Sequence, residues 1–373
     1  MKILLTGGGT GGHLIPLLSV VDEIRKRDPK AEFLFVGPKS GFNEALKMAG
    51  IEVREVNAGK FRRYFSWENF LDVFRVLVGI DEAIFHLWKF KPDVVFSKGG
   101  FASVPAVVAA HYLRVPVFTH ESDTMPGLSN KLIGRLAKKV FISFPESRNH
   151  FLDSKIVVSG NPIREDILQG DKDRGRKFFG FTDDLPVILI FGGSQGAQRI
   201  NEILFGSLGK LLDEFQIIHI CGDKNYEELK KKVESMNIPN GSRYRTYPYL
   251  HKEMKDAFAL SDFIISRAGA NSLSEIIALE KPSLVIPLPS AANNHQYHNA
   301  KHFADQNMII MAEEKDLDAD KFLEKIGELQ DRKTDLVHNL NKYNNSIGGK
   351  KPEKIIAESL LRTVLTESKD SSL

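Results

Sequence analysis

One design occurs twice in this chain: a short apolar run, a glycine loop and a helical pattern. The copies are ILLTGGGTGGH at Ile3 to His13 and ILIFGGSQGAQ at Ile188 to Gln198, about half a chain apart. Each copy has the form of the first strand-loop-helix unit of its own domain. A length of 373 residues also exceeds what one hydrophobic core usually supports. The pattern predicts an α/β protein with two Rossmann-like, doubly wound parallel-sheet domains that face each other across a cleft.

Further apolar runs alternate with helical patterns in both halves: KILLT, EFLFVG, DVVFSKGG, VPVFTHE and KVFISF, then PVILIFGG, QIIHICG, DFIISRAG and PSLVIPLP. We expect the domain boundary in SGNPIRED, where Pro162 forces an extended preceding residue. The predicted domains are residues 1–162 and 163–349. A C-terminal helix at about 350–366 is expected to pack back on the first domain.

Composition excludes several classes of protein. The formal charge is only +3, with basic residues spread among acidic ones, so nucleic acid is not an expected partner. Cys221 is the single cysteine, which rules out an intrachain disulfide and indicates a reducing compartment. The most apolar stretch, Phe101 to Phe118, is interrupted by prolines and charged residues, so any membrane contact is expected to be peripheral.

The first glycine loop is a candidate phosphate site. Gly7, Gly9 and Gly12 satisfy G-x-G-x-x-G, but the second strand lacks the acidic residue that a dinucleotide site needs, which disfavours an oxidoreductase. The loop can still present backbone N–H groups to a diphosphate at a helix N-terminus. His13 follows directly and is a candidate for proton transfer. The alternative is a histidine that caps or packs within the first helix.

Two further loops repeat the arrangement. Gly99, Gly100 and Ser103 follow the strand DVVFS, and a tight turn explains them as well as an anion site does. The loop from Gly192 to Ala197 adds Ser194 as a side-chain donor, although Ser194 could be an N-cap.

The segment ISRAGANSLSEIIALEKP predicts a strand ending at Ser266 and a helix beginning near Ser272. Ser272 and Glu275 fit a capping box. Glu275 could also accept hydrogen bonds from two ribose hydroxyls, while Arg267 could meet a diphosphate.

The segment KFRRYFSWENFLDVFRVLVGIDEAIFHLWKF combines basic residues with a helix that is apolar on more than one face. Such a helix is either an interfacial membrane helix or part of the core. The basic residues are Lys60, Arg62 and Arg63, and the candidates for insertion are Phe65, Trp67, Phe74 and Trp88.

Six motifs in the right order resemble the MurG family, the N-acetylglucosaminyltransferases of peptidoglycan synthesis: GGTGGH, SKGGFASVP, HESDTMPGLSNK, GNPIR, GGSQGAQ and SRAGANSLSE. The resemblance runs from the first strand to about Ala300. It implies a GT-B fold like that of glycosyltransferase family 28, with UDP-N-acetylglucosamine as donor. It also implies transfer to the C4 hydroxyl of undecaprenyl-diphosphoryl-N-acetylmuramoyl-pentapeptide (lipid I to lipid II), with inversion and without an obligatory metal or other cofactor.

The resemblance also assigns residues. His13 occupies the position of the general base. The donor site would comprise Thr10, Gly11, Gly12, Asp123, Arg164, Ser194, Leu250, Arg267, Ala270, Asn271, Ser272, Leu273, Ser274, Glu275 and Gln296, and the acceptor diphosphate would meet Gly8, Gly9, Gly99, Gly100 and Ser103. The chain departs from some members at Asp123, where they carry Asn, and at His295, where they carry Gln.

The resemblance gives each domain a role, the first at the acceptor and membrane and the second at the UDP-sugar. Expected partners are UDP-N-acetylglucosamine, undecaprenyl-linked lipid I, an anionic membrane surface and other cell-wall enzymes. The expected location is the cytoplasmic face of a bacterial inner membrane, in cell wall biogenesis and division. Three alternatives stay open: another GT-B glycosyltransferase that makes glycolipids, a UDP-sugar 2-epimerase, and a non-catalytic nucleotide-sugar binder.

Overall fold

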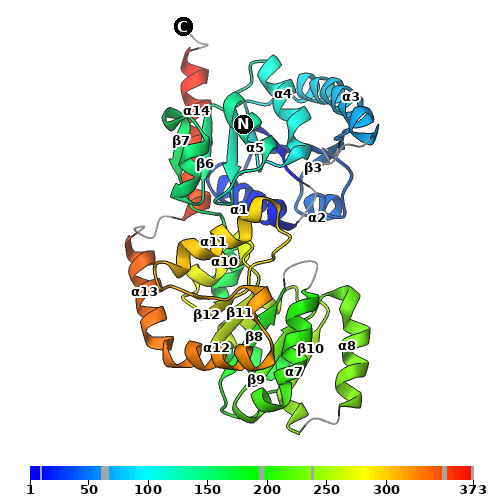
Figure 1. Ribbon diagram of the computed structural model, residues 1–373. Helices are drawn as coiled ribbons and strands as arrows, with labels where there is room; N and C mark the ends of the chain where they lie inside the picture. The colour runs from blue at the N-terminus through cyan, green and yellow to red at the C-terminus, as the bar shows by residue number, and fades with distance from the viewer. Residues whose placement is uncertain (9–10, 60–66, 193–196, 237–238, 347–350, 371–373) are drawn as a thin grey trace. The chain divides into compact units, whose positions relative to one another are not determined.

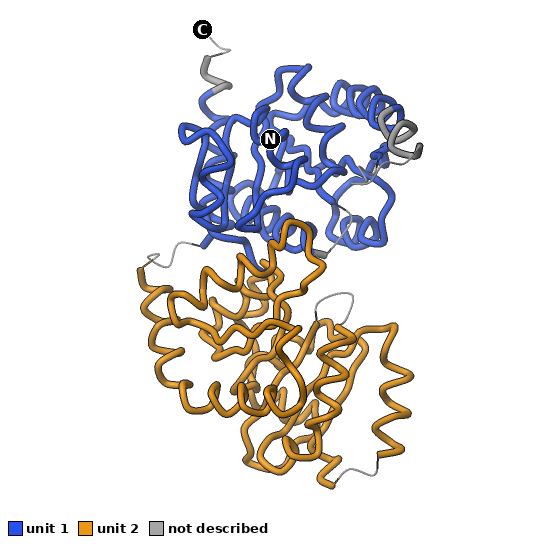
Figure 2. The backbone as a smooth tube through the Cα atoms, viewed as in Figure 1, with its two compact units in different colours: residues 1–163, 350–373 blue, residues 164–349 orange. Residues whose placement is uncertain are grey.

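The computed structural model describes residues 1–8, 11–59, 67–192, 197–236, 239–346 and 351–370 (Figure 1). The chain divides into two compact units (Figure 2). Unit 1 comprises Met1–Ile163 and Lys350–Leu373, and unit 2 comprises Arg164–Gly349. The division differs by one residue from the boundary expected at 162/163.

Unit 1 is built on a parallel sheet of seven strands in the order β3-β2-β1-β4-β5-β6-β7. The strands are β1 (Lys2–Thr6), β2 (Glu32–Gly37), β3 (Glu52–Glu55), β4 (Val94–Ser97), β5 (Val117–Glu121), β6 (Lys139–Ile142) and β7 (Ile156–Val158). The helices are α1 (Gly11–Arg27), α2 (Asn43–Met48), α3 (Trp67–Phe90), α4 (Val104–Tyr112), α5 (Leu128–Leu136) and α14 (Pro352–Asp370), with short 3₁₀ turns at Phe101–Ser103, Pro145–His150 and Asp153–Lys155.

Helices cover both faces of this sheet, so its central strands are buried on both sides. On one face Leu17 and Val20 of α1 share a core with Ile356 and Leu360 of α14. On the other face Ala83 and Leu87 of α3 share a core with residues of α4 and α5. The C-terminal helix therefore returns to pack on the first unit, beside α1.

Unit 2 has a parallel sheet of six strands in the order β10-β9-β8-β11-β12-β13. The strands are β8 (Val187–Phe191), β9 (Gln216–Ile220), β10 (Tyr244–Tyr247), β11 (Phe263–Ser266), β12 (Ser283–Val285) and β13 (Ile310–Met311). The helices are α6 (Lys172–Phe179), α7 (Gln198–Glu214), α8 (Asp223–Ser235), α9 (Met254–Leu260), α10 (Ala270–Ala278), α11 (His295–Ala304), α12 (Ala319–Asp331) and α13 (Lys333–Ser346), with 3₁₀ turns at Glu165–Gln169, Gly241–Arg243, Ala292–Asn294 and Glu314–Asp316.

The two sheets share one topology. In each, the first, second and third strands of the unit follow one another outward to one edge, and the later strands follow one another outward to the other edge. This is the doubly wound order, and the prediction of two Rossmann-like sheets is confirmed. The direction of winding switches between β1 and β4 in unit 1 and between β8 and β11 in unit 2. Ligands of such sheets bind beyond the carboxyl ends of the strands at these points, so the loops there form the candidate site.

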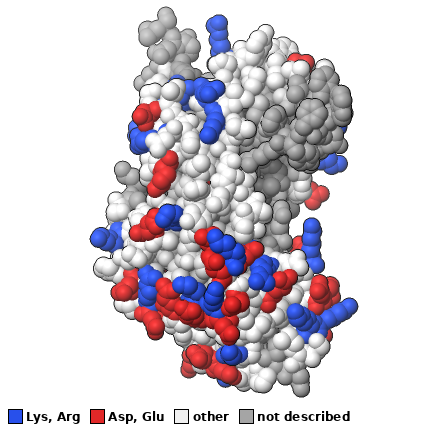
Figure 3. Space-filling model, in the orientation of Figure 1, with Lys and Arg blue, Asp and Glu red and all other residues white. Residues whose placement is uncertain are grey.

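Two properties of the surface bear on function. On the face shown in Figure 3, lysine and arginine side chains are interspersed with aspartate and glutamate over unit 2. Among the helices of the described residues, none is both long enough and apolar enough to cross a membrane.

Candidate active site

Two loops meet at the switch point of unit 1. The first follows β1 with Gly7 and Gly8 and leads into α1, and its residues Gly9 and Thr10 lie outside the described part of the chain. The second follows β4 and contains Lys98, Gly99 and Gly100 before the turn at Phe101–Ser103. Because β1 and β4 are paired neighbours, both loops emerge side by side.

The second loop requires its glycines. Gly99 and Gly100 have φ angles of 78° and 83°, in the left-handed region. A Cβ atom at Gly99 would lie 2.4 Å from Oδ1 of Asn130, and one at Gly100 would lie 3.2 Å from Cε1 of His13. The close packing of this turn therefore excludes side chains, as the tight-turn interpretation requires.

The polar groups of this loop are used inside the protein. The Gly99 N–H donates to Oγ of Ser97 (3.0 Å), and the Gly100 N–H donates to Oδ1 of Asn130 (2.7 Å). The Ser103 hydroxyl is fully buried and donates to the Gly99 carbonyl (2.7 Å). In this conformation these bonds occupy the Gly99 and Gly100 N–H groups, and the contact of Gly99, Gly100 and Ser103 with an acceptor diphosphate stays a prediction.

His13 lies in the first turn of α1 and is half-buried. Its Nδ1 lies 3.2 Å from the Lys98 carbonyl. A carbonyl only accepts, so the neutral ring carries its proton on Nδ1 and leaves a lone pair on Nε2. Burial and the Lys98 ammonium lower the pKa of His13 to about 4, against opposing effects of the Lys98 carbonyl and of Asp123. The ring is therefore neutral at pH 7, and it contacts the neighbouring loop rather than capping its own helix.

A buried polar cluster lies behind this loop, at the carboxyl ends of β4 and β5. The Lys98 ammonium donates to Oγ of Ser122. The Glu121 carboxylate accepts from Nδ2 of Asn130 (2.6 Å) and from the Asp123 N–H (2.9 Å). Sequence reasoning assigned no task to Lys98, Glu121 or Asn130, although a lysine directly after the short, mostly apolar run VVFS was a usable signal.

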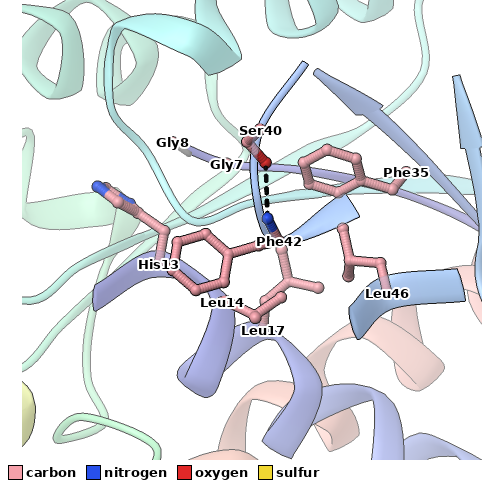
Figure 4. A pocket seen from close by; sticks show the side chains of 9 residues that line it. All are labelled: Gly7, Gly8, His13, Leu14, Leu17, Phe35, Ser40, Phe42 and Leu46. Carbon is pink, nitrogen blue, oxygen red and sulfur yellow. Dashed lines mark hydrogen bonds between the residues drawn. The ribbon is translucent and has the colours of Figure 1, made fainter. Parts of the chain in front are cut away.

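A small apolar pocket adjoins His13 (Figure 4). The rings of Phe35 and Phe42 line it, and Oγ of Ser40 accepts a hydrogen bond from the Phe42 N–H (3.4 Å). The remaining lining residues are Gly7, Gly8, Leu14, Leu17 and Leu46. His13 thus borders an apolar environment, in keeping with its lowered pKa.

The switch point of unit 2 also carries two loops. The loop after β8 contains Ser194, which lies outside the described residues. The loop after β11 leads into α10, which begins at Ala270 with Gly269 as its N-cap residue. The predicted capping box of Ser272 and Glu275 is therefore wrong, since both residues lie inside the helix.

The first turns of α10 display small and polar residues at the switch point. Asn271, Ser272 and Ser274 are half-buried, while Ala270 and Leu273 are buried. The Ser274 hydroxyl donates back to the Ala270 carbonyl (2.8 Å). The backbone N–H groups at the start of a helix carry partial positive charge, so this end of α10 suits an anion.

Glu275 is held in a buried position against Arg164. It is 6% exposed, and its Oε1 lies 3.6 Å from Nε of Arg164. Burial raises the pKa of Glu275 to about 7, with Asp166 acting in the same direction and Arg164 against it. The carboxylate thus changes its charge near neutral pH.

The Arg267 guanidinium is buried and bonded to other protein groups. It is 6% exposed, and its Nη1 donates to the carbonyls of Ile286 and Pro287, each at 3.2 Å. Its Nη2 pairs with the Glu314 carboxylate. The guanidinium is therefore bound by protein groups in this conformation, and its contact with the diphosphate stays a prediction.

The remaining residues expected near the donor lie in both units. Leu250 is buried after β10. Oε1 of Gln296 accepts a hydrogen bond from the Leu288 N–H (3.0 Å), so the amide is anchored to the loop after β12. Nδ1 of His295 lies 2.7 Å from the Ala292 carbonyl. In unit 1, Asp123 is half-buried on the loop after β5.

Helix α3 buries one side and exposes an apolar stripe on the other. Ala83 and Leu87 are buried. The exposed fractions are 54% for Phe74, 54% for Leu77, 49% for Val78, 58% for Phe85 and 67% for Trp88. Phe74 and Trp88 are thus not core residues. Lys60, Arg62, Arg63, Phe65 and the side chain of Trp67 lie outside the described part of the chain.

Comparison with known proteins agrees with this arrangement. Residues 3–142 match the glycosyltransferase family 28 N-terminal domain, and residues 187–358 match the glycosyltransferase family 28 C-terminal domain. The chain therefore belongs to glycosyltransferase family 28, and the prediction of a glycosyltransferase is confirmed.

Individual proteins similar to this chain share one named activity. One relative is a UDP-N-acetylglucosamine--N-acetylmuramyl-(pentapeptide) pyrophosphoryl-undecaprenol N-acetylglucosamine transferase of Clostridium botulinum. The two sequences are 40% identical over 95% of this chain and 98% of the relative. A transferase of the same name, numbered 2, from Bacillus cereus is 37% identical over 96% of the chain and 99% of its own length. The crystal structure of Acinetobacter baumannii MurG superposes with a TM-score of 0.74 at 25% identity, covering 97% of this chain and 99% of that one. The resemblance to MurG is thus confirmed.

The fold is shared with a 2-epimerase, one of the alternative functions. A UDP-GlcNAc 2-epimerase from Neisseria meningitidis has a TM-score of 0.68 at 17% identity, covering 98% of this chain and all of that one, which shows a shared fold alone. Within the described ranges, no group of three or more His, Cys, Asp or Glu side chains is arranged to hold a metal ion.

Proposed function

We propose that this chain transfers N-acetylglucosamine from UDP-N-acetylglucosamine to the N-acetylmuramoyl-pentapeptide of a pyrophosphoryl-undecaprenol acceptor, the step from lipid I to lipid II. The observation that carries the proposal is 40% identity, over 95% of the chain, to a transferase named for that donor and acceptor. The identity spans both units rather than one domain. A binder of nucleotide sugars would have no use for a neutral histidine at the switch point of unit 1.

Unit 2 would bind the donor. The Glu275 carboxylate would accept hydrogen bonds from the ribose hydroxyls, and the N-terminus of α10 would receive the diphosphate. Arg164, which already lies beside Glu275, would supply the positive side chain. Thr10, Gly11, Gly12, Asp123, Ser194, Leu250 and Gln296 stay proposed donor contacts on the strength of the family resemblance.

Unit 1 would activate the acceptor. Nε2 of His13 would take the proton of the acceptor C4 hydroxyl as its oxygen attacks the anomeric carbon and the bond to UDP breaks. The new bond forms on the face opposite the departing UDP, which inverts the anomeric configuration. Gly8 and Gly9, at the N-terminal side of α1, would lie near the acceptor diphosphate. Fixed helix N-termini and Arg164 would meet the negative charge on UDP, so we propose no obligatory metal.

Helix α3 would hold the enzyme at the cytoplasmic face of the membrane. A stripe of five exposed apolar side chains suits the boundary between headgroups and acyl chains. Arg75 and Lys89 are exposed on the same helix and suit anionic headgroups.

The experiment that tests the proposal follows radiolabelled N-acetylglucosamine from its UDP conjugate, with and without a short-chain lipid I analogue. We expect label in the lipid fraction, and only when the acceptor is present. Formation of an epimeric sugar or of free UDP in the tube without acceptor, and no labelled lipid in the other, would replace this proposal with a 2-epimerase.

A further inference from the structure

Lys98 is a buried lysine to which the proposed chemistry assigns no task. It is 1% exposed and follows β4, whose four residues are all buried. An ammonium group held out of water is costly unless nearby groups compensate its charge. Its place directly after a wholly buried strand therefore calls for a functional or electrostatic reason.

The compensating groups lie at the end of β5 and on the loop that follows it. Glu121 is 3% exposed, and its carboxylate is fixed by Asn130 and by the Asp123 N–H. The Lys98 ammonium donates to Oγ of Ser122, between the two acidic residues in sequence. Burial lowers the pKa of Lys98, while the charges of Glu121 and Asp123 raise it again. Burial and Asp123 raise the pKa of Glu121. The cluster is thus a buried set of mutually compensating charges.

This cluster is joined to His13 through Lys98 itself. The Lys98 carbonyl accepts from Nδ1 of His13, which fixes the tautomer through the backbone. The charged groups that act on the imidazole are Lys98, from the loop after β4, and Asp123, from the loop after β5. The Lys98 ammonium disfavours the imidazolium form and Asp123 favours it. The buried histidine of β5, His120, is engaged elsewhere, because its Nε2 lies 3.0 Å from the Gly160 carbonyl.

We propose that Lys98 is a positioning residue for His13: its carbonyl selects the tautomer with a lone pair on Nε2, and its buried positive charge adds to the burial of the ring in disfavouring the imidazolium form, so that the ring can accept a proton. The inference rests on the proposed function where it takes His13 as the base. Its electrostatic part concerns the ring alone and can be measured without any substrate.

The test is a titration of the His13 ring by NMR in the full-length protein, with the resonance assigned by its loss in His13→Ala. In the unchanged protein the ring should stay mostly neutral down to pH 5. In Lys98→Met, which keeps the length of the side chain and removes its charge, the pKa of His13 should rise, because burial of the ring still lowers it but the Lys98 ammonium no longer does, while Asp123 still favours the imidazolium form. Lys98→Arg keeps the charge and should leave the titration unchanged.

A double variant covers the case in which Lys98→Met does not fold. Lys98→Met leaves Glu121 buried without its cation, whereas the double variant Lys98→Met/Glu121→Gln removes both charges. The pKa of His13 should rise in the double variant as well, since Glu121 is not among the groups that shift it. Glu121→Gln alone should not raise it. An unchanged His13 titration in both variants that lack Lys98 would overturn the inference.

Transfer kinetics separate this inference from the proposed function. If His13 is the base, the acidic limb of the kcat/KM profile should move to higher pH in Lys98→Met by the same amount as the ring titration. A shifted ring titration in a protein that transfers no sugar to lipid I would refute the proposed function and leave the charge coupling intact. A lowered kcat/KM with unmoved limb and titration would reduce Lys98 to a packing role and overturn the inference.

Discussion

At the scale of single residues, His13 and Glu275 lie at the switch points of the two units, but after different strands. His13 is in α1, which follows β1, the first strand of unit 1, and Glu275 is in α10, which follows β11, the fourth strand of unit 2. Both have a pKa shifted by burial, which lowers that of His13 and raises that of Glu275. Both shifts favour the neutral form of the group, yet the tasks differ. A base must be neutral before it reacts, whereas a carboxylate that binds ribose must be ionised.

Replacing His13 should damage chemistry rather than donor binding. His13→Ala removes the proposed proton acceptor, so kcat should fall roughly 10²- to 10⁴-fold while the Kd for UDP-N-acetylglucosamine changes little. Steady-state kinetics and calorimetry give the two quantities. His338→Ala, at an exposed position on α13, is the matched control and should alter neither. A parallel loss of donor affinity in His13→Ala would contradict its assignment as the base.

Donor affinity should depend on pH through Glu275. Its pKa of about 7 means that the carboxylate is ionised above neutral pH and protonated below it. Affinity for UDP-N-acetylglucosamine should therefore be highest above pH 7 and fall several-fold, up to about tenfold, between pH 8 and pH 6. This donor has no ionisation of its own in that range.

Glu275→Gln is the control for that pH dependence. Because its amide does not ionise, the variant should bind weakly at every pH and show a nearly flat profile in calorimetry. A profile in Glu275→Gln as steep as that of the unchanged protein would assign the titration to another group.

At the scale of elements, the sequence predicted the inner strands and missed the outer ones. Nine strands were expected from apolar runs, and all nine are present. The four that were missed are β3, β7, β10 and β13, which form the two edges of each sheet. An inner strand is buried on both faces and needs a continuous apolar run. An edge strand such as β3, with the sequence EVRE, is mostly exposed and has no such run.

Helix α3 is the element that should carry membrane affinity. Replacing Phe74 and Trp88 by Ser removes two exposed aromatic side chains, so binding to vesicles that contain anionic phospholipid should weaken at least about tenfold. Cosedimentation measures this binding. Turnover of a short-chain, soluble lipid I analogue should be unaffected, because the two side chains belong to the exposed side of α3.

Phe178→Ser provides the matched control for α3. Phe178 is an aromatic residue of α6 in unit 2 with an exposed fraction of 48%. The variant should bind vesicles normally. An equal loss in Phe178→Ser, or no loss in the α3 variant, would show that the stripe does not contact the membrane.

At the scale of the whole molecule, sequence reasoning located the candidate site better than its internal bonds. The strand-glycine-helix pattern marked the loops of both switch points, and in the loop after β4 the φ angles of Gly99 and Gly100 lie in the left-handed region that favours glycine. The network of Lys98, Glu121 and Asn130 was not predictable, since it depends on three segments meeting beyond β4 and β5. The capping box failed because α10 begins directly after Gly269, two residues earlier than expected.

We propose a single displacement in which protein groups alone activate the acceptor and stabilise the departing UDP. The most direct measurement determines the anomeric configuration of the product made from UDP-N-acetylglucosamine and a lipid I analogue with excess chelator present. UDP-N-acetylglucosamine is the α-anomer, so we expect a β-linked product formed at an undiminished rate. An α-linked product, or a reaction abolished by the chelator and restored by a divalent cation, would contradict it.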